Sequence, residues 1–96
     1  MADLSVVVYV VARIGEAERT KSELLKLVTQ SRNELGCLQF ELHQENEDAA
    51  RFIIIERWQS EDLFQAHFDG PNVKNAIAAT RASLSSFKVT KVTRLA

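Results

Sequence analysis

Three residues that lie close together in the sequence could carry chemistry: Glu56, Trp58 and His67. The first two alternate within residues 51–58, an apolar, β-branched segment typical of a strand, so they share one face. His67 follows in residues 61–68, where the spacing of apolar side chains predicts a helix. A carboxylate and an imidazole beside an aromatic wall can bind a flat, weakly acidic ring and take its proton. The pattern therefore predicts a site for such a ring between this strand and this helix.

Apolar side chains accompany the acid and the histidine on the same predicted surfaces. Alternation in the strand and four-residue spacing in the helix select them. We assign His67 as the catalytic base or anion stabiliser and Glu56 as the catalytic carboxylate that orients it. The predicted substrate-binding residues are Phe52, Ile54, Trp58, Phe64 and Phe68, with Trp58 and Phe64 forming the wall against the ring.

Structural roles compete with these assignments. A histidine on the apolar stripe of a helix is usually a core residue with one satisfied nitrogen, and spacing alone favours that role for His67. A lone tryptophan near a strand end is most often packing. His43 falls on the polar face of a predicted edge strand and is expected at the surface or an interface. Cys37 has no local histidine to activate it, so we expect an inert thiol.

Other chemistries find little support in the sequence. Two histidines without a clustered cysteine or carboxylate make a poor metal site, and three glycines form no phosphate-binding loop. No Ser/His/Asp arrangement stands out. A net charge of −1 provides no basic field for nucleic acid or an anionic membrane. We therefore expect no metal, no bound cofactor, no nucleic acid partner and no membrane partner.

The elements that must position the site follow from periodicity and turn signals, and 96 residues fit a single domain, 1–96. Their order, β-α-β-β-α-β, predicts an antiparallel four-stranded sheet with helices on one face, a ferredoxin-like α+β fold. Ser60 is expected to cap the second helix and Asp69-Gly70-Pro71 to interrupt it. The predicted strands are 4–14, 37–44, 51–58 and 86–95, and the predicted helical segments are 16–35, 61–68 and 72–84.

Two patterns fix which side chains should face the core. In the first helix, apolar and small residues recur at three- and four-residue spacing, and Gly36 is placed to end the helix in a left-handed conformation. In the second strand, alternation separates an apolar face from a face carrying Gln39, Glu41 and His43. The expected core residues are Leu24, Val28, Ser31 and Leu35 in the helix, with Leu25 and Leu27 widening the stripe, and Leu38, Phe40 and Leu42 in the strand.

The first and third predicted strands are apolar on both faces. Helices can cover only one face, and soluble monomers avoid exposing a continuous apolar surface. We therefore expect a homodimer in which two sheets pack face to face. In the first strand one face carries Val6, Val8 and Val10 and the other carries Val7, Tyr9 and Val11, and Tyr9 could line either surface of the sheet. In the third strand Phe52 and Ile54 oppose Ile53 and Ile55.

The compartment is expected to be the cytoplasm. The lone Cys37 forms no internal disulfide, which fits a reducing setting. The apolar run 6–12 lacks a basic segment before it, so it does not resemble a signal peptide. It is also far shorter than the roughly 20 residues that cross a bilayer.

Several of these segments together resemble the antibiotic biosynthesis monooxygenase (ABM) domain. They are 36–44, 51–58 and Ala66-His67-Phe68, with Pro71 shortly after. The resemblance spans essentially the whole chain. It implies a dimeric α+β barrel and a pocket between the helices and the sheet of each subunit. In some members the substrate is deprotonated in this dry pocket and reacts with O₂ directly, without metal, flavin or haem.

Departures from better-defined members narrow the resemblance. Anthrone-oxidising members carry an asparagine and a tyrosine where this chain has Ile54 and Phe64, and only Trp58 is retained. Haem-degrading members use an asparagine in the first strand and a histidine in the last helix, and both are missing here. The chain is thus similar to the quinol-monooxygenase-like branch. A non-oxidative isomerase or lyase of a small hydroxy-ketone, of the kind that acts on an autoinducer-2 breakdown product, and a non-catalytic dimeric binding module remain as alternatives.

Overall fold

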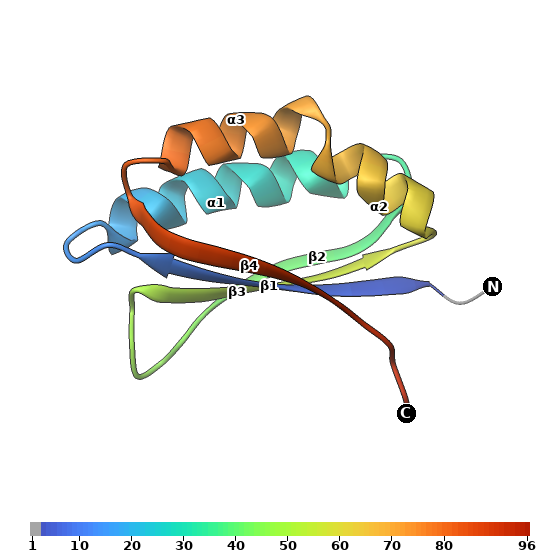
Figure 1. Cartoon of the computed structure of the whole chain (residues 1–96), viewed down its shortest axis with the longest axis horizontal. Helices are drawn as coiled ribbons and strands as arrows, with labels where there is room; N and C mark the ends of the chain where they lie inside the picture. Colours follow the sequence, from blue (N-terminus) through green and yellow to red (C-terminus); the bar gives the residue numbers. More distant parts are fainter. Residues whose placement is uncertain (1–2) are drawn as a thin grey trace.

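The fold is a four-stranded antiparallel sheet covered on one face by three helices (Figure 1). A computed structural model describes residues 3–96, so the first two residues of the predicted domain lie outside it. The strand order is β2-β3-β1-β4, which confirms the ferredoxin-like α+β prediction. The elements are β1 (Leu4–Ala12), α1 (Ala17–Arg32), β2 (Cys37–Gln44), β3 (Arg51–Trp58), α2 (Glu61–Phe68), α3 (Pro71–Thr80) and β4 (Leu84–Val92).

Most of the buried apolar residues that the sheet contributes to the core lie on the two central strands, β1 and β3. Their alternate residues face the helices and pair across the sheet, as Val8 does with Ile54 and Val10 with Phe52. All four of these side chains are at least 92% buried. β-branched residues suit this pleated, packed environment. On the same face, Val6 lies opposite Glu56, so a carboxylate enters an otherwise apolar layer.

The first helix ends earlier than periodicity predicts. α1 ends at Arg32, where the backbone N–H of Asn33 donates to the carbonyl of Gln30 and that of Glu34 donates to the carbonyl of Ser31. Leu35, predicted in the core, is 80% exposed because it lies in the turn beyond the helix. Leu25, predicted to widen the apolar stripe, is 51% exposed because it lies about 100° around the helix from the buried Leu24. Gly36 does adopt a left-handed conformation, with φ of 85°.

The start of β2 departs from simple alternation. The pairing register with β3 shifts between Cys37 and Gln39, so an irregularity lies at the strand's first residues. Leu38, predicted on the core face, is consequently 46% exposed, whereas Phe40 is 2% exposed. A bulge of this kind re-aims a side chain, and sequence alternation does not reveal it.

Other boundaries differ as well, most of them near the end of the last helix. α3 runs from 71 to 80 rather than from 72 to 84, and β4 from 84 to 92 rather than from 86 to 95. A turn fixes this change: the Ser83 carbonyl accepts from the backbone N–H of Arg13, and its hydroxyl meets that of Thr20 at 3.0 Å. The same bond leads the chain out of β1, which ends at Ala12 rather than at 14.

At Gly36 the α1–β2 turn is packed closely against α2. A Cβ at this position would lie 2.5 Å from Cδ1 and 2.9 Å from Cβ of Leu63. We expect Gly36→Ala to lower the free energy of unfolding by about 2–4 kcal/mol, since it adds a clash to the left-handed strain. Gly15→Ala is the matched control, because Gly15 has φ of 80° but open space around it. Equal losses in urea unfolding would show that the contact with Leu63 is unimportant.

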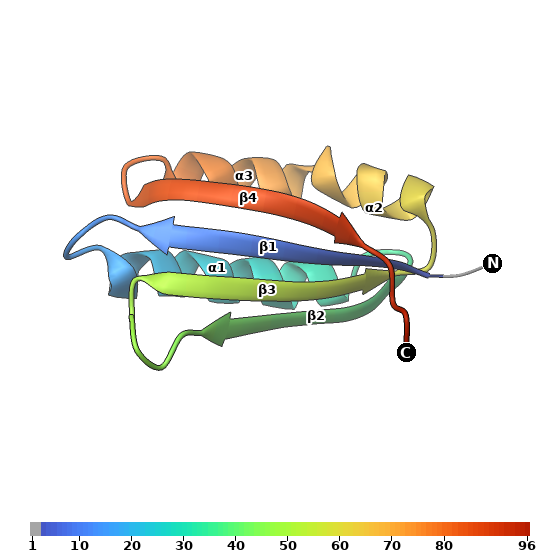
Figure 2. The ribbon, with the colours of Figure 1, turned by 60° about the horizontal axis from the view of Figure 1, so that its bottom comes forward.

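The face of the sheet turned away from the helices has no element over it in the described chain (Figure 2). Tyr9 is 48% exposed there, and Val7, Val11, Ile53 and Ile55 are only partly buried. No helix within residues 3–96 is long and apolar enough to cross a membrane.

Candidate active site

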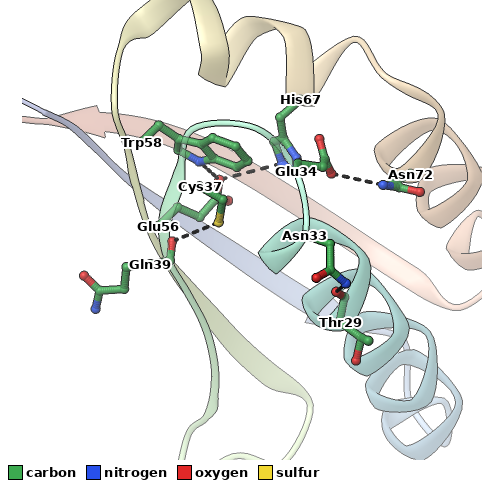
Figure 3. Close-up of polar contacts among 9 residues, drawn as sticks. All are labelled: Thr29, Asn33, Glu34, Cys37, Gln39, Glu56, Trp58, His67 and Asn72. Atoms are coloured by element: carbon green, nitrogen blue, oxygen red, sulfur yellow. Dashed lines mark hydrogen bonds and ion pairs between the residues drawn. The ribbon is translucent and has the colours of Figure 1, made fainter.

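The acid and the tryptophan predicted from the sequence lie together on the helix-facing side of β3 (Figure 3). Trp58 is fully buried and Glu56 is 3% exposed. The indole Nε1–H of Trp58 donates to Oε1 of Glu56 at 2.8 Å. This bond partly compensates the removal of the carboxyl from water and fixes its orientation.

His67 projects from α2 onto this pair. The helix is fixed at its start by the Ser60 hydroxyl, which accepts from the backbone N–H of Leu63, as predicted. The imidazole lies 4.4 Å from the Trp58 ring, centre to centre, and its Nε2 lies 3.8 Å from Oε1 of Glu56. At 4% exposure His67 is buried. A carboxyl, an indole and an imidazole therefore meet in one place.

A fourth residue, Glu34, completes the cluster and was not predicted. Its Oε2 lies 3.0 Å from Nδ1 of His67 and accepts from the side-chain amide of Asn72 at 3.1 Å (Figure 3). Glu34 lies in the turn after α1, in a segment that the periodicity assigns to the helix. Because the helix ends at Arg32, the side chain of Glu34 is directed toward α2. The one signal in the sequence for such a turn is that Glu34 lies two residues before Gly36.

A cavity of about 70 Å³ lies between the sheet and the helices beside this cluster. Its polar lining residues are Glu56, His67 and Thr80, and the Thr80 hydroxyl already donates to the Ala76 carbonyl at 2.7 Å. The partly exposed Ile77 and Phe87 also line it, so it opens to solvent between α3 and β4. The acid and the histidine thus face a largely apolar space.

The cavity divides the predicted site residues into two sets. Ile54, Glu56, Phe64, His67 and Phe68 line it. Trp58 and Phe52 lie outside its lining, both almost completely buried. The indole packs against the imidazole at an angle of 33° between the ring planes and donates a hydrogen bond to the carboxyl, so it lies behind the two polar groups rather than against a bound ring.

Burial shifts both titratable groups toward their neutral forms. Removal from water raises the pKa of Glu56 from 4.5 to about 7, opposed by the bond from Trp58 and reinforced by the charge of Glu34. Removal from water likewise lowers the pKa of His67, while Glu34 opposes that change. A neutral imidazole beside an acid that titrates near pH 7 is a pair suited to proton transfer.

The raised pKa of Glu56 predicts a pH-dependent stability gain in Glu56→Gln. Below about pH 4 the carboxyl is protonated in both the folded and the unfolded chain. Between about pH 4.5 and 7 the carboxyl of Glu56 is already ionised in the unfolded chain but still protonated in the folded one, so the free energy of unfolding of the wild type falls. The total loss reaches about 3 kcal/mol above pH 7. Glutamine carries no such penalty, and urea unfolding should show its advantage growing from pH 4 to pH 8.

Glu41→Gln is the matched control for that measurement, because Glu41 is half exposed beside His43. Its difference from wild type should show no comparable rise between pH 4.5 and 7. If the free energies of unfolding of Glu56→Gln and wild type differ by the same amount at every pH, the carboxyl of Glu56 does not have a raised pKa in the folded protein.

The remaining candidate residues lie apart from the cavity. His43 is 53% exposed at its side chain and lies 3.4 Å from Glu41 on the uncovered face of the sheet. Cys37 donates weakly to the Gln39 carbonyl, and burial and the nearby carboxylates Glu56 and Glu34 raise its thiol pKa, which disfavours a reactive thiolate. Within residues 3–96, no three side chains of metal-ligating type converge as an ion would require.

A family model for the antibiotic biosynthesis monooxygenases matches residues 4–79, most of the chain and every residue of the cluster. The chain belongs to this family. The ABM resemblance seen in the sequence is thereby confirmed. No protein with a curated description is detectably similar to it in sequence.

Solved structures share the fold of this ABM chain. PA3566 from Pseudomonas aeruginosa is 32% identical, with a TM-score of 0.94 over 100% of this chain and 97% of that one. Rv0793 from Mycobacterium tuberculosis is 21% identical, with a TM-score of 0.89 over 99% and 97%. A protein described as an antibiotic biosynthesis monooxygenase is 18% identical, with a TM-score of 0.89 over 97% and 99%. The last two likenesses concern the fold alone.

Proposed function

We propose that this ABM protein is a cofactor-independent monooxygenase of a small quinol or phenol-like aromatic. His67 takes the proton of a ring hydroxyl, and the resulting electron-rich anion reacts directly with O₂. One oxygen atom of O₂ enters the ring as a quinone carbonyl and the other leaves as water, and the substrate itself supplies the four electrons. The observation that carries the proposal is the placement of His67 and Glu56 on the wall of an otherwise apolar cavity. In such a dry site a ring anion is held by a few fixed polar groups rather than by water.

Glu56 has a distinct part in this proposal. Its Oε1 is fixed by Trp58 and lies 3.8 Å from Nε2 of His67, so both groups border the space where a hydroxyl would enter. Because its pKa is raised to about 7, the carboxyl retains a proton over part of the neutral range. In that form it can donate a hydrogen bond to the substrate oxygen.

The cavity favours an uncharged substrate. Among the described residues that line it there is no lysine or arginine. A phosphate or carboxylate placed there would lose water without gaining a cation. This observation weighs against a phosphorylated hydroxy-ketone, the substrate type considered for the non-oxidative alternative.

Oxygen uptake with paired compounds tests the proposal. Naphthols and hydroquinones should be consumed with O₂, and hydroxynaphthoates, which retain the hydroxyl but add a carboxylate, should react poorly. Turnover that proceeds equally without O₂ would replace the proposal with the isomerase or lyase alternative. Tight binding of naphthols without turnover would replace it with a non-catalytic binding module.

The proposal includes a homodimer formed through the uncovered sheet face. Its centre is apolar, with Tyr9, Ile53 and Ile55 at least partly exposed. We expect a dimer by light scattering at micromolar concentration, and a monomer for Ile55→Lys. Leu25→Lys is the control, because Leu25 is 51% exposed on α1, on the other side of the sheet. A monomeric wild-type chain would contradict the proposal.

A further inference from the structure

The geometry points to Glu34 as a positioning residue for His67. Glu34 holds the imidazole proton on Nδ1, so that Nε2 is the free base beside Glu56 and the cavity. It also stabilises the imidazolium that forms when Nε2 takes a proton. The catalytic consequence rests on the proposed function, whereas the placement of the proton does not.

Hydrogen-bond chemistry supports the placement of the proton. Oε2 of Glu34 lies 3.0 Å from Nδ1 of His67, and a carboxylate oxygen can only accept. The ring nitrogen that faces it must therefore carry the hydrogen. The other nitrogen, Nε2, lies 3.8 Å from Glu56, too far for a hydrogen bond. Nε2 thus keeps its lone pair available.

Three elements hold Glu34 in place. It lies in the turn between α1 and β2, its carboxylate contacts His67 on α2, and Asn72 at the start of α3 donates to the same oxygen at 3.1 Å. The Glu34 side chain is 23% exposed, whereas that of His67 is 3% exposed. In this pair the carboxylate of Glu34 is therefore partly exposed to solvent, and the imidazole of His67 is buried.

The proton transfer balances without a further reactant. The O–H bond of the ring hydroxyl breaks and its electron pair remains on oxygen, while the lone pair of Nε2 forms the new N–H bond. His67 becomes an imidazolium with Nδ1–H still bonded to Glu34. Burial opposes this charge and lowers the pKa of His67, and Glu34 is the group that counteracts it.

The titratable groups around His67 come from four segments of the chain. Glu34 faces it from the α1–β2 turn and Glu56 from β3. Cys37 on β2 is within electrostatic reach of both carboxylates. From β4, the ammonium of Lys91 lies 5.7 Å from the Phe64 ring centre. Of these, only Glu34 is within hydrogen-bond distance of the imidazole.

Nitrogen-15 NMR of the imidazoles tests the inference on the whole chain. In a His43→Gln background, His67 supplies the only imidazole signal, and its nitrogen shifts report the tautomer. We expect the Nδ1–H form at neutral pH in the presence of Glu34. Glu34→Ala should lose that preference and lower the pH at which the imidazole titrates, and Glu34→Gln should lower that pH as well. Glu41→Ala, which removes a half-exposed carboxylate on the uncovered face of the sheet, should change neither property.

The possible results separate this inference from the proposed function. An Nε2–H tautomer in the wild-type background overturns the inference, even if the variants do not fold. An unchanged tautomer and titration in folded Glu34→Ala also overturns it. If the tautomer is as expected and a naphthol is turned over, kcat should fall about 10- to 100-fold in Glu34→Ala, with a shifted pH profile and little change in KM. If the tautomer is as expected but nothing is turned over, the positioning role stands and the proposed function fails.

Discussion

Replacing His67 with glutamine is expected to lower kcat for an accepted naphthol or hydroquinone by about 10²- to 10⁴-fold, the usual contribution of a general base. Among the described residues that line the cavity, His67 is the only one with a ring nitrogen base. Glutamine retains much of its volume and polarity but cannot take a proton. KM should change much less than kcat, since the apolar walls that bind the ring remain.

The control for this loss is His43→Gln, which removes the other histidine of the chain on the uncovered face of the sheet. It should retain wild-type rates. Circular dichroism and urea unfolding of His67→Gln would verify that the fold is intact. Equal rates in wild type and His67→Gln would remove His67 from the mechanism and leave it as a core histidine.

The second large effect is on stability, in Trp58→Ala. The indole is fully buried, packs against the His67 ring and donates to Glu56. Its loss should lower the free energy of unfolding by about 3–5 kcal/mol, a large part of the roughly 5–15 kcal/mol that holds a typical domain together. The measurement is urea unfolding at pH 7.

Trp58→Phe separates packing from hydrogen bonding at this position. Phenylalanine retains much of the apolar volume but cannot donate to Glu56, so the carboxyl should titrate at a still higher pH. Ile54→Val, a small deletion on the same face of β3, is the reference for a simple packing loss, at about 0.5–1.5 kcal/mol. If Trp58→Ala costs no more than this, the tryptophan does not organise the cluster.

Alternation and helical spacing in the sequence were sufficient to predict which side chains of β3 and of α2 share one face. Alternation placed Glu56 and Trp58 on one face, and four-residue spacing placed Phe64 and Phe68 on one side of α2. The bounds of β2, β3 and α2 also agree with the structure. Short, strongly patterned segments with clear turn residues at both ends explain this success.

The rest depends on contacts between segments that are distant in the sequence. Glu34 meets His67 across 33 positions, and this contact exists only because α1 ends at Arg32. Leu38 leaves the core face because of a register shift against β3, which alternation does not encode. The position of Trp58 behind the imidazole, rather than on the cavity wall, likewise follows from tertiary packing.

The absorption spectrum of a bound naphthol, recorded without O₂, tests the central claim most directly. At a pH well below the naphthol's own pKa, the free compound is neutral. The account predicts that binding to the wild-type protein produces the naphtholate spectrum, because His67 takes the proton, and that binding to His67→Gln does not. A bound naphthol that remains neutral in both proteins would contradict it.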